Sequence, residues 1–244
     1  MATVAFIGSD GAGKTTVIRK IQNDFPVPVK YIYLGLNLES SNYSLPTSRL
    51  ILNLKLRSIR KKAADMENLD PVYLSTHAIS HRRQKRGRLW IAMRTFNRLF
   101  EAWYRQIISW FFQARGYLVV YDRHFLFDTA PPPDTKFRQP LANRIFRWFL
   151  SHMYPKTDLV LFLDADPETL LKRKQEVPRD YLISQRAAIL AQGSATHNFV
   201  KIDASQTVEK VYTEAIHHIM RIPHFIKRME IGDSRYSIPD SQNI

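Results

Sequence analysis

The chain has 244 residues, of which 45% are hydrophobic and 24% are charged. This composition excludes disordered, collagen-like and small disulfide-rich proteins, and the absence of cysteine excludes disulfides, thiol catalysis and cysteine-bound metals. The 36 Lys and Arg residues against 22 Asp and Glu leave a net charge of +14, which predicts a polyanionic partner such as a phosphorylated small molecule, nucleic acid or anionic lipid. We expect a cytoplasmic protein, because no secretory signal and no apolar run long enough for a membrane span is present.

Five apolar runs rich in β-branched and aromatic residues predict strands. Long stretches with helical spacing separate them, a pattern typical of a parallel sheet with helical crossovers. We therefore expect an α/β protein in three layers, with a five-stranded parallel sheet and helices on both faces. The predicted strands are Val4–Ile7, Val29–Leu34, Tyr117–Tyr121, Leu159–Leu163 and Phe199–Ile202.

We predict a single domain over residues 1–225, followed by a C-terminal tail over 226–244. A basic insertion is expected at about 36–88, with a helix near 50–62. Between Ser44 and Arg105 the chain has 14 basic and 4 acidic residues, so this segment carries most of the excess positive charge. Three consecutive prolines, Pro131–Pro133, stiffen the loop that follows the third strand.

The clearest helix is predicted over Leu89–Ala114, where apolar residues recur every three or four positions. One interpretation packs the apolar side chains into the core and leaves a charged face in solvent. The other places the helix against a membrane surface or an acidic partner. The apolar positions are Leu89, Met93, Phe96, Phe100, Trp103, Ile107 and Trp110, and the charged positions are Arg94, Arg98, Glu101 and Arg105.

The segment Gly8–Thr15 matches the pattern G-x-x-x-x-G-K-[ST] and stands between the first strand and a helix predicted from Lys14 to about Asn23. Its glycines allow a tight turn whose N–H groups form an anion nest at a helix N-terminus. Lys14 would reach the β- and γ-phosphates of ATP, and the Thr15 hydroxyl would ligate Mg²⁺. The predicted nucleotide-binding residues of this loop are Gly8, Asp10, Gly11, Ala12, Gly13, Lys14, Thr15 and Thr16.

Charged residues also follow the third and fourth strands. Asp122 is a strand-end carboxylate that could hold Mg²⁺ directly or through water, and Arg123 could bind a phosphate with two hydrogen bonds. The other interpretation is that Asp122 and Arg123 only form hydrogen bonds with the loop backbone. After the fourth strand, Asp166 and Pro167 read as an ordinary helix start. The cations beyond it are either a lid over the transferring phosphates or a solvated face. They are Lys172, Arg173, Lys174, Arg179 and Arg186.

Four motifs in this order resemble the thymidylate kinase family of P-loop nucleotide kinases, and the resemblance covers residues 1–35 and 88–220. It implies that Asp10 faces the acceptor's sugar, and that Asp122 and Arg123 serve magnesium and the acceptor phosphate. The motifs are Gly8–Thr16, Asp122–His124, Phe162–Glu168 and Ile202–Gln206.

The same resemblance implies further roles. Gly11 stands where some members carry Arg, and members with Gly there use a lid arginine, which favours Arg173 and Arg179 as catalytic cations. The position of the family's thymine-reading arginine falls near Glu101, between Arg98 and Arg105, which become acceptor candidates. A homodimer is also implied, and the loop bordering the adenine would be Ala204, Ser205 and Gln206.

The acceptor half departs from the family pattern. Leu34–Asn37 replaces an Arg-Glu-Pro-Gly-Gly stretch, and Phe125–Thr129 replaces residues that read the nucleotide. The first hypothesis is an ATP- and Mg²⁺-dependent kinase for a nucleoside monophosphate, with dTMP the family default, or for another small acceptor such as a sugar. If the acceptor is an alcohol, the candidate bases are Asp10, Asp122 and Asp128. The alternative is an ATP-binding protein whose basic segment binds nucleic acid or an anionic membrane.

Overall fold

The computed structural model describes residues 1–35, 41–50, 53, 57, 88–131, 140–173 and 178–231. Within these residues the five predicted strands form one all-parallel sheet in the order β2-β3-β1-β4-β5. Each strand lies within one residue of its predicted bounds, so the predicted sheet is confirmed. The strands are β1 Thr3–Ile7, β2 Val29–Tyr33, β3 Leu118–Asp122, β4 Leu159–Asp164 and β5 Phe199–Asp203.

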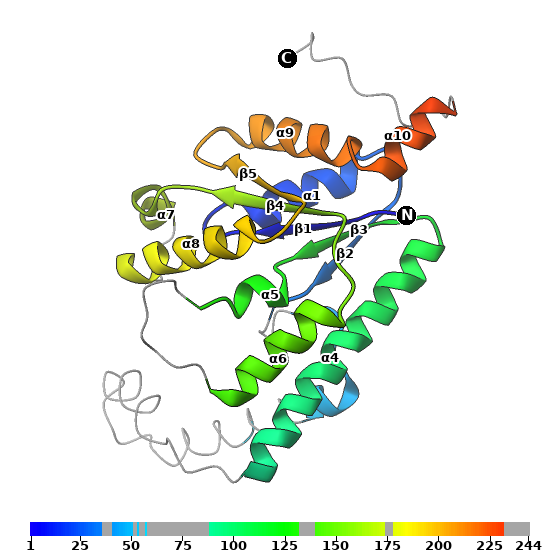
Figure 1. Ribbon diagram of the computed structural model, residues 1–244. Helices are drawn as coiled ribbons and strands as arrows, with labels where there is room; N and C mark the ends of the chain where they lie inside the picture. Colours follow the sequence, from blue (N-terminus) through cyan, green and yellow to red (C-terminus); the bar gives the residue numbers. More distant parts are fainter. Residues whose placement is uncertain are drawn as a thin grey trace.

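Helices cover both faces of the sheet and complete the three layers that the sequence predicts (Figure 1). A separate hydrophobic cluster lies on each side of the sheet. One face carries α1 (Lys14–Asp24), α9 (Val208–Met220) and α10 (Pro223–Glu230). The other carries α4 (Arg88–Ala114), α5 (Phe125–Asp128), α6 (Leu141–His152) and α8 (Arg179–Ser194), while α7 (Pro167–Arg173) lies beyond the carboxyl end of β4.

Parallel pairing brings the carboxyl ends of all strands to one edge. In the register of β1 with β3, Phe6 lies opposite Asp122, and the Arg123 N–H donates to the Phe6 carbonyl oxygen at 2.9 Å. The loop after β1 therefore leaves the sheet beside the loop after β3. Ligand sites of open α/β sheets lie at this edge.

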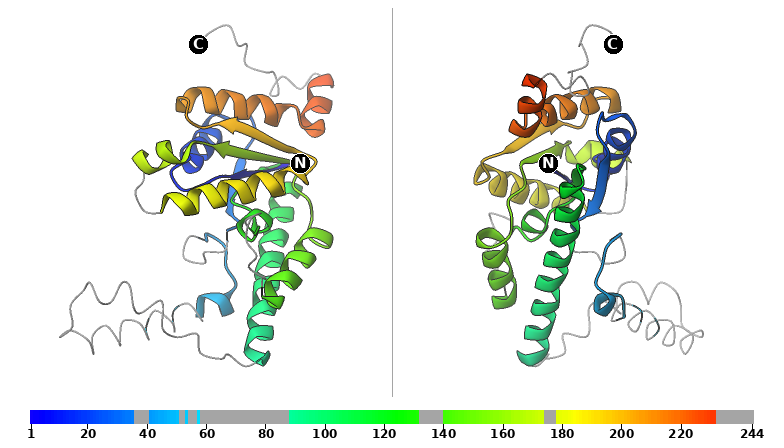
Figure 2. Two further views of the ribbon diagram at one scale, coloured as in Figure 1. Left: turned by 60° about the vertical axis from the view of Figure 1, so that its left-hand side comes forward. Right: turned by 90° about the vertical axis from the view of Figure 1, so that its right-hand side faces the viewer.

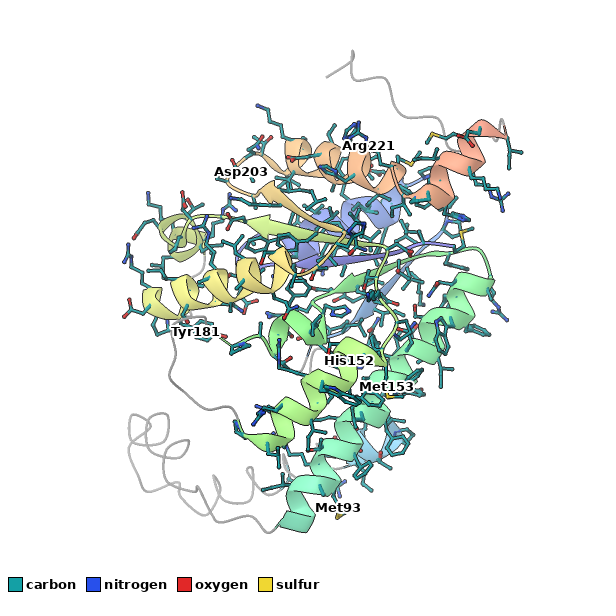
Figure 3. The ribbon with its side chains drawn as sticks, viewed as in Figure 1. Met93, His152, Met153, Tyr181, Asp203 and Arg221 are labelled. Atoms are coloured by element: carbon teal, nitrogen blue, oxygen red, sulfur yellow. The ribbon has the colours of Figure 1, made fainter. Side chains whose placement is uncertain are left out.

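The helix predicted over Leu89–Ala114 is confirmed as α4, but the interpretation that packs its apolar side chains into the core is wrong. Met93, Phe96 and Phe100 are all more than 60% exposed, and Met93 lies at the end of α4 far from the sheet (Figure 3). Figure 2 shows the N-terminal part of α4 projecting past the sheet. The side chains buried on this helix are instead Glu101, Ala102, Arg105, Gln106 and Ser109.

The buried face of α4 is explained by a charge pair that holds the chain leaving β2. The Arg105 guanidinium is 1% exposed and bonds to the Glu101 carboxylate at 3.0 Å. It also donates to the carbonyl oxygens of Tyr33, Gly35 and Tyr43 at 3.0–3.2 Å. Because every one of these partners is an oxygen, burial leaves the guanidinium satisfied.

Glu101 completes this connection. Its carboxylate accepts hydrogen bonds from the Leu45 N–H at 3.1 Å and from the Ser48 hydroxyl at 2.7 Å. The pair thus joins α4 to the segment 41–50, more than 50 residues away in the chain. The two residues predicted to be on a solvated face are buried because they supply the polar contacts that this backbone needs.

Several predicted features lie wholly or partly outside the described residues. These are most of the basic insertion at 36–88, the helix near 50–62 except at positions 50, 53 and 57, two of the three prolines, and the tail from 232 onward. The domain boundary predicted at residue 225 falls within α10, where Phe225 is fully buried against Phe25. In the part of the chain that is described, no helix is both long and apolar enough to cross a bilayer.

We predict that Arg105→Met lowers the free energy of unfolding by about 3–5 kcal/mol, because it leaves the Glu101 carboxylate buried without its counter-charge. Urea denaturation followed by circular dichroism measures the change. Arg94→Met, on the exposed side of the same helix, is the control and should change stability by less than about 0.5 kcal/mol. Equal stability of wild type and Arg105→Met would contradict the structural role given to the pair.

Candidate functional site

The loop between β1 and α1 has the geometry of an anion nest. Gly11 and Gly13 adopt φ angles of 87° and 83°, a left-handed conformation that glycine takes without the penalty of a Cβ. Gly13 stands directly before α1, and none of the described side chains caps that helix end. The first N–H groups of α1 are therefore left to a ligand, and a phosphate is the group that such a helix start binds best.

Lys14 is the buried cation of this loop. Its ammonium donates to the carbonyl oxygens of Gly8 at 2.9 Å and Ser9 at 2.8 Å, and the residue is 6% exposed. Burial, with the nearby Arg123 charge, lowers the pKa of Lys14 to about 8. The two carbonyl contacts hold the charge beside the nest, at the place where a bound phosphate would need it.

Asp122 ends β3 with a carboxylate that is 6% exposed. One of its oxygens, Oδ2, accepts a hydrogen bond from the Tyr31 hydroxyl at 3.0 Å. Burial and the Asp122 charge raise the pKa of Tyr31, so this hydroxyl stays protonated and keeps donating. The other oxygen, Oδ1, is buried and has no hydrogen-bond partner among the described residues.

The site has the donor types that magnesium prefers. Mg²⁺ binds oxygen ligands and is commonly held by one or two protein oxygens together with substrate phosphates and water. The unpartnered Asp122 oxygen and the Thr15 hydroxyl belong to residues that line the same cavity. The described residues hold no group of three or more His, Asp or Glu side chains arranged around one metal position. The two oxygens named above suit a cation whose other ligands would be phosphate and water oxygens.

Arg123 has an unusual backbone conformation, and its side chain contacts two carboxylates. Its φ of 68° lies in the left-handed region, which costs a non-glycine residue about 1–3 kcal/mol and is found mostly at functional sites. Its guanidinium bonds to the Asp10 carboxylate and lies 3.9 Å from that of Asp128. Burial works against the charge, but the Asp128 and Asp10 carboxylates prevail and raise the pKa of Arg123.

These groups share one cavity of about 1040 Å³ at the carboxyl edge of the sheet. Its walls come from the loop after β1, the end of β2, the segment after β3, and helices α7 and α8. The lining residues are Asp10, Gly11, Gly13, Lys14, Thr15, Thr16, Tyr31, Tyr33, Asp122, Arg123, Phe127, Asp128, Ala130, Arg173, Tyr181, Ser184, Gln185 and Ala188.

Helix α8 is fixed over the loop by two polar contacts. The Ser9 hydroxyl donates to Gln185 at 2.9 Å, and Arg186 forms two 2.7 Å bonds to the Asp164 carboxylate. Tyr181 on α8 and Asp203 at the end of β5 both lie on the side toward which the strands point (Figure 3). The contacts make α8 a wall of the cavity.

The two arginines that the resemblance favours as lid cations differ in their contacts and in their distance from the cavity. Arg173 lines the cavity and donates to the Ala204 carbonyl oxygen at 2.9 Å. Arg179 is largely exposed and bonds to Glu168 at 2.7 Å, and it is not among the lining residues. Of the two, the structure therefore brings only Arg173 to the phosphate loop. The connection 174–177 lies outside the described residues.

The two arginines predicted to read the acceptor lie away from the cavity. Arg98 bonds to Asn143 on α6 at 3.3 Å and lies over the Phe146 ring. Arg105 is buried in the carbonyl cluster beside Glu101. Neither lines the cavity, because each is engaged by another element of the fold.

The loop predicted to border the adenine lies at the carboxyl end of β5. The Ala204 N–H donates to the Asp164 carbonyl oxygen at 2.6 Å, and Ser205 donates twice to the Asp203 carboxylate at 2.6–2.9 Å. Arg173 donates to the Ala204 carbonyl oxygen, so the loop lies next to this cavity-lining arginine. Ala204, Ser205 and Gln206 are not among the residues that line the cavity itself.

Several lining residues had no role in the sequence interpretation. Tyr31 and Tyr33 stand at alternate positions of β2, so they share one face at the carboxyl end of this strand. Their spacing and their place at the strand end could have been recognised from the sequence. Tyr181 and Gln185 on α8 have no comparable signal, since only the packing of α8 over the loop brings them here.

Comparisons with known proteins give little beyond the fold. No protein-family model matches the chain, and no curated protein matches it. Among solved structures, the chain is similar to deoxyadenosine kinase from M. mycoides, determined with bound dATP. The identity is 14% and the TM-score 0.48, over 88% of this chain and 98% of that one. A structural similarity of this degree does not indicate what activity the chain has.

We predict that ATP affinity falls as the pH rises through the pKa of Lys14. In the free protein the ammonium loses its proton near pH 8, so ATP affinity should drop about tenfold between pH 8 and pH 9.5. Calorimetric titration with Mg·ATP at several pH values measures this change in affinity. Lys14→Arg keeps its charge throughout this range and should abolish the fall. A wild-type affinity that stays constant up to pH 9.5 would contradict the assignment.

Proposed function

We propose that the protein is an ATP- and magnesium-dependent phosphotransferase acting on a small molecule. The observation that carries the proposal is the meeting, in one cavity, of an anion nest, the buried Lys14 ammonium and the unpartnered Asp122 oxygen. Phosphoryl transfer needs little covalent help from a protein. Positioning and neutralisation of charge supply most of the catalysis.

Each group has a role in this scheme. The loop N–H groups would bind the β- and γ-phosphates, and Lys14 would neutralise their charge. Thr15 and Asp122 would hold magnesium, which supplies further neutralisation of the phosphates when bound. Arg123 and Arg173 are the remaining cations of the described lining, and they stand on opposite sides of the loop.

The resemblance to thymidylate kinases covers the ATP-binding half of the sequence better than the acceptor half, so the acceptor is the least constrained part of the proposal. A nucleoside monophosphate, with dTMP the default, remains a prediction from that resemblance. A cytoplasmic location remains a prediction from the sequence. The acceptor would bind beside the phosphate loop, where the end of β2 and the segment after β3 contribute to the cavity lining. The alternative is an ATP-binding protein that binds nucleic acid or a membrane. It depends on a basic segment that lies mostly outside the described residues.

We predict that Lys14→Ala abolishes phosphoryl transfer and leaves the fold intact. The loss follows from removal of the charge that faces the transferring phosphoryl group, and a fall of at least about 1000-fold in ADP release is expected. The assay is ADP release from Mg·ATP against nucleoside monophosphates, nucleosides, sugars and sugar phosphates. Lys210→Ala, exposed at the start of α9, is the matched control.

Two results would count against this proposal. One is full activity of Lys14→Ala, and the other is a wild-type protein that binds no ATP. Binding of ATP without turnover, together with salt-sensitive binding to nucleic acid or to anionic vesicles, would favour the alternative.

We also predict the homodimer that the resemblance implies, and we propose that the exposed apolar side of α4 is its interface. Large exposed apolar patches usually mark such contacts, and this one includes Phe96, Phe100 and Ile107. Sedimentation equilibrium should give twice the mass of one chain, and Phe100→Asp should give a monomer. Ile231→Asp, an exposed site beyond α10, is the control. A monomeric wild type would contradict the prediction.

A further inference from the structure

The two oxygens of the Asp122 carboxylate have different surroundings. Oδ2 accepts a hydrogen bond from the Tyr31 hydroxyl at 3.0 Å, while Oδ1 is buried and has no hydrogen-bond partner among the described residues. A buried carboxylate oxygen that is left without a partner costs free energy, and such atoms are uncommon in native proteins. Oδ1 would find its partner in a magnesium ion bound together with a nucleotide.

The register of the sheet brings Tyr31 within reach of this carboxylate. In the pairing of β2 with β3, Tyr33 lies opposite Asp122, and Tyr31 lies opposite Val120. Because side chains alternate between the two faces of a sheet, Tyr31 and Asp122 point to the same face. Tyr31 is thus the diagonal neighbour of Asp122, at a separation that a long aromatic side chain can span.

The backbone of Tyr31 is held on both edges of β2. On one edge it pairs with β3. On the other edge the Asn42 side-chain amide makes the contacts that a further strand would make. Its nitrogen donates to the Tyr31 carbonyl oxygen at 2.9 Å, and its oxygen accepts from the Tyr33 N–H at 3.1 Å. A side chain on a backbone that is bonded on both edges has a defined position, as a group that orients a metal ligand requires.

Lys14 and Arg123 line the same cavity as Asp122, but their hydrogen bonds go to other groups. Burial lowers the pKa of Lys14, and the Asp122 charge acts against this effect. The Lys14 ammonium nevertheless donates to two carbonyl oxygens of the phosphate loop, and the Arg123 guanidinium contacts two other carboxylates. Within the described part of the chain, the hydrogen bond that orients the Asp122 carboxylate therefore comes from Tyr31.

We propose that Tyr31 is a positioning residue for magnesium: its hydroxyl holds Oδ2 of Asp122 and leaves Oδ1 to bind the metal that accompanies ATP. This inference rests on the phosphotransferase function proposed above. Carboxylates that bind metals are commonly held by such outer hydrogen bonds, and loss of the outer partner weakens metal binding or activity about 10- to 100-fold. Tyr31 contacts neither the metal nor the phosphates in this scheme, so its effect is on metal affinity and not on the affinity for metal-free nucleotide.

The first test measures metal binding and does not need turnover. Mn²⁺, which prefers the same oxygen ligands as Mg²⁺, is titrated into full-length protein mixed with an equimolar amount of ADP. Electron paramagnetic resonance measures the free Mn²⁺. Tyr31→Phe keeps the ring and removes the hydroxyl, so it should weaken Mn²⁺ binding at least tenfold. Its affinity for ADP in excess EDTA, measured by calorimetry, should stay within twofold of wild type.

Tyr212→Phe is the matched control. It removes a tyrosine hydroxyl from α9, outside the lining of the cavity, and it should bind Mn²⁺ as the wild type does. Mn²⁺ binding by Tyr31→Phe within twofold of wild type would overturn the inference. An equal loss of metal-free ADP affinity would also overturn it, because the hydroxyl would then support the whole site and not the metal.

The second test asks whether Tyr31 acts through Asp122. Asp122→Asn should weaken Mn²⁺ binding at least tenfold, because an amide carries no charge. The ADP phosphates still hold Mn²⁺ in this variant, so the weakened affinity remains measurable. Adding Tyr31→Phe to Asp122→Asn should change Mn²⁺ affinity less than twofold, whereas the effects of independent residues multiply. Multiplied effects would contradict a role that passes through Asp122.

A failure of the proposed function gives a different result from a failure of this inference. A wild type that binds no ADP, or that binds ADP without taking up Mn²⁺, would contradict the phosphotransferase proposal and the role of Tyr31 with it. A wild type that binds both, alongside a Tyr31→Phe variant that binds Mn²⁺ equally well, would contradict the role of Tyr31 alone.

Discussion

The parallel pairing of β1 with β3 is the constraint on which the site depends. With Phe6 opposite Asp122, the phosphate loop and the Asp122–Arg123 pair leave the sheet side by side, although more than 100 residues separate them in the chain. The bond between Arg123 and Asp10 follows from this register. A shift of one residue would turn Asp122 to the other face of the sheet and separate these groups.

A second constraint is the buried pair of Glu101 and Arg105. A buried ion pair is stable only when hydrogen bonds satisfy its remaining groups, and here the backbone of the chain leaving β2 supplies them. The same contacts hold the exit of β2, and with it Tyr33 and Gly35, next to Arg123. Because polar residues occupy the buried face of α4, apolar residues such as Phe96 and Phe100 are exposed on the rest of the helix.

The charged groups of the cavity act on one another. Burial and the Arg123 charge lower the pKa of Lys14, whereas the carboxylates of Asp122, Asp10 and Asp128 act in the opposite direction. The excess of basic residues in the sequence does not determine the charge of this cavity, because Arg98 and Arg105, which the resemblance assigned to the acceptor, are engaged elsewhere. Net charge is a property of the whole chain, whereas recognition depends on which charges remain unpaired at one place.

The sequence by itself determined the strands, the phosphate loop and the start of α1, because these depend on short-range spacing: runs of β-branched residues, glycines that allow a left-handed turn, and a lysine and threonine at the first helical positions. Only the tertiary structure decided which face of α4 is buried, that Arg105 serves the backbone, and that Arg123 is shared by Asp10 and Asp128. The contacts that settle these points join residues mostly 50 to more than 100 positions apart. A helical period shows that one face of the helix is apolar. Which face is buried also depends on distant backbone groups that must form hydrogen bonds with the helix.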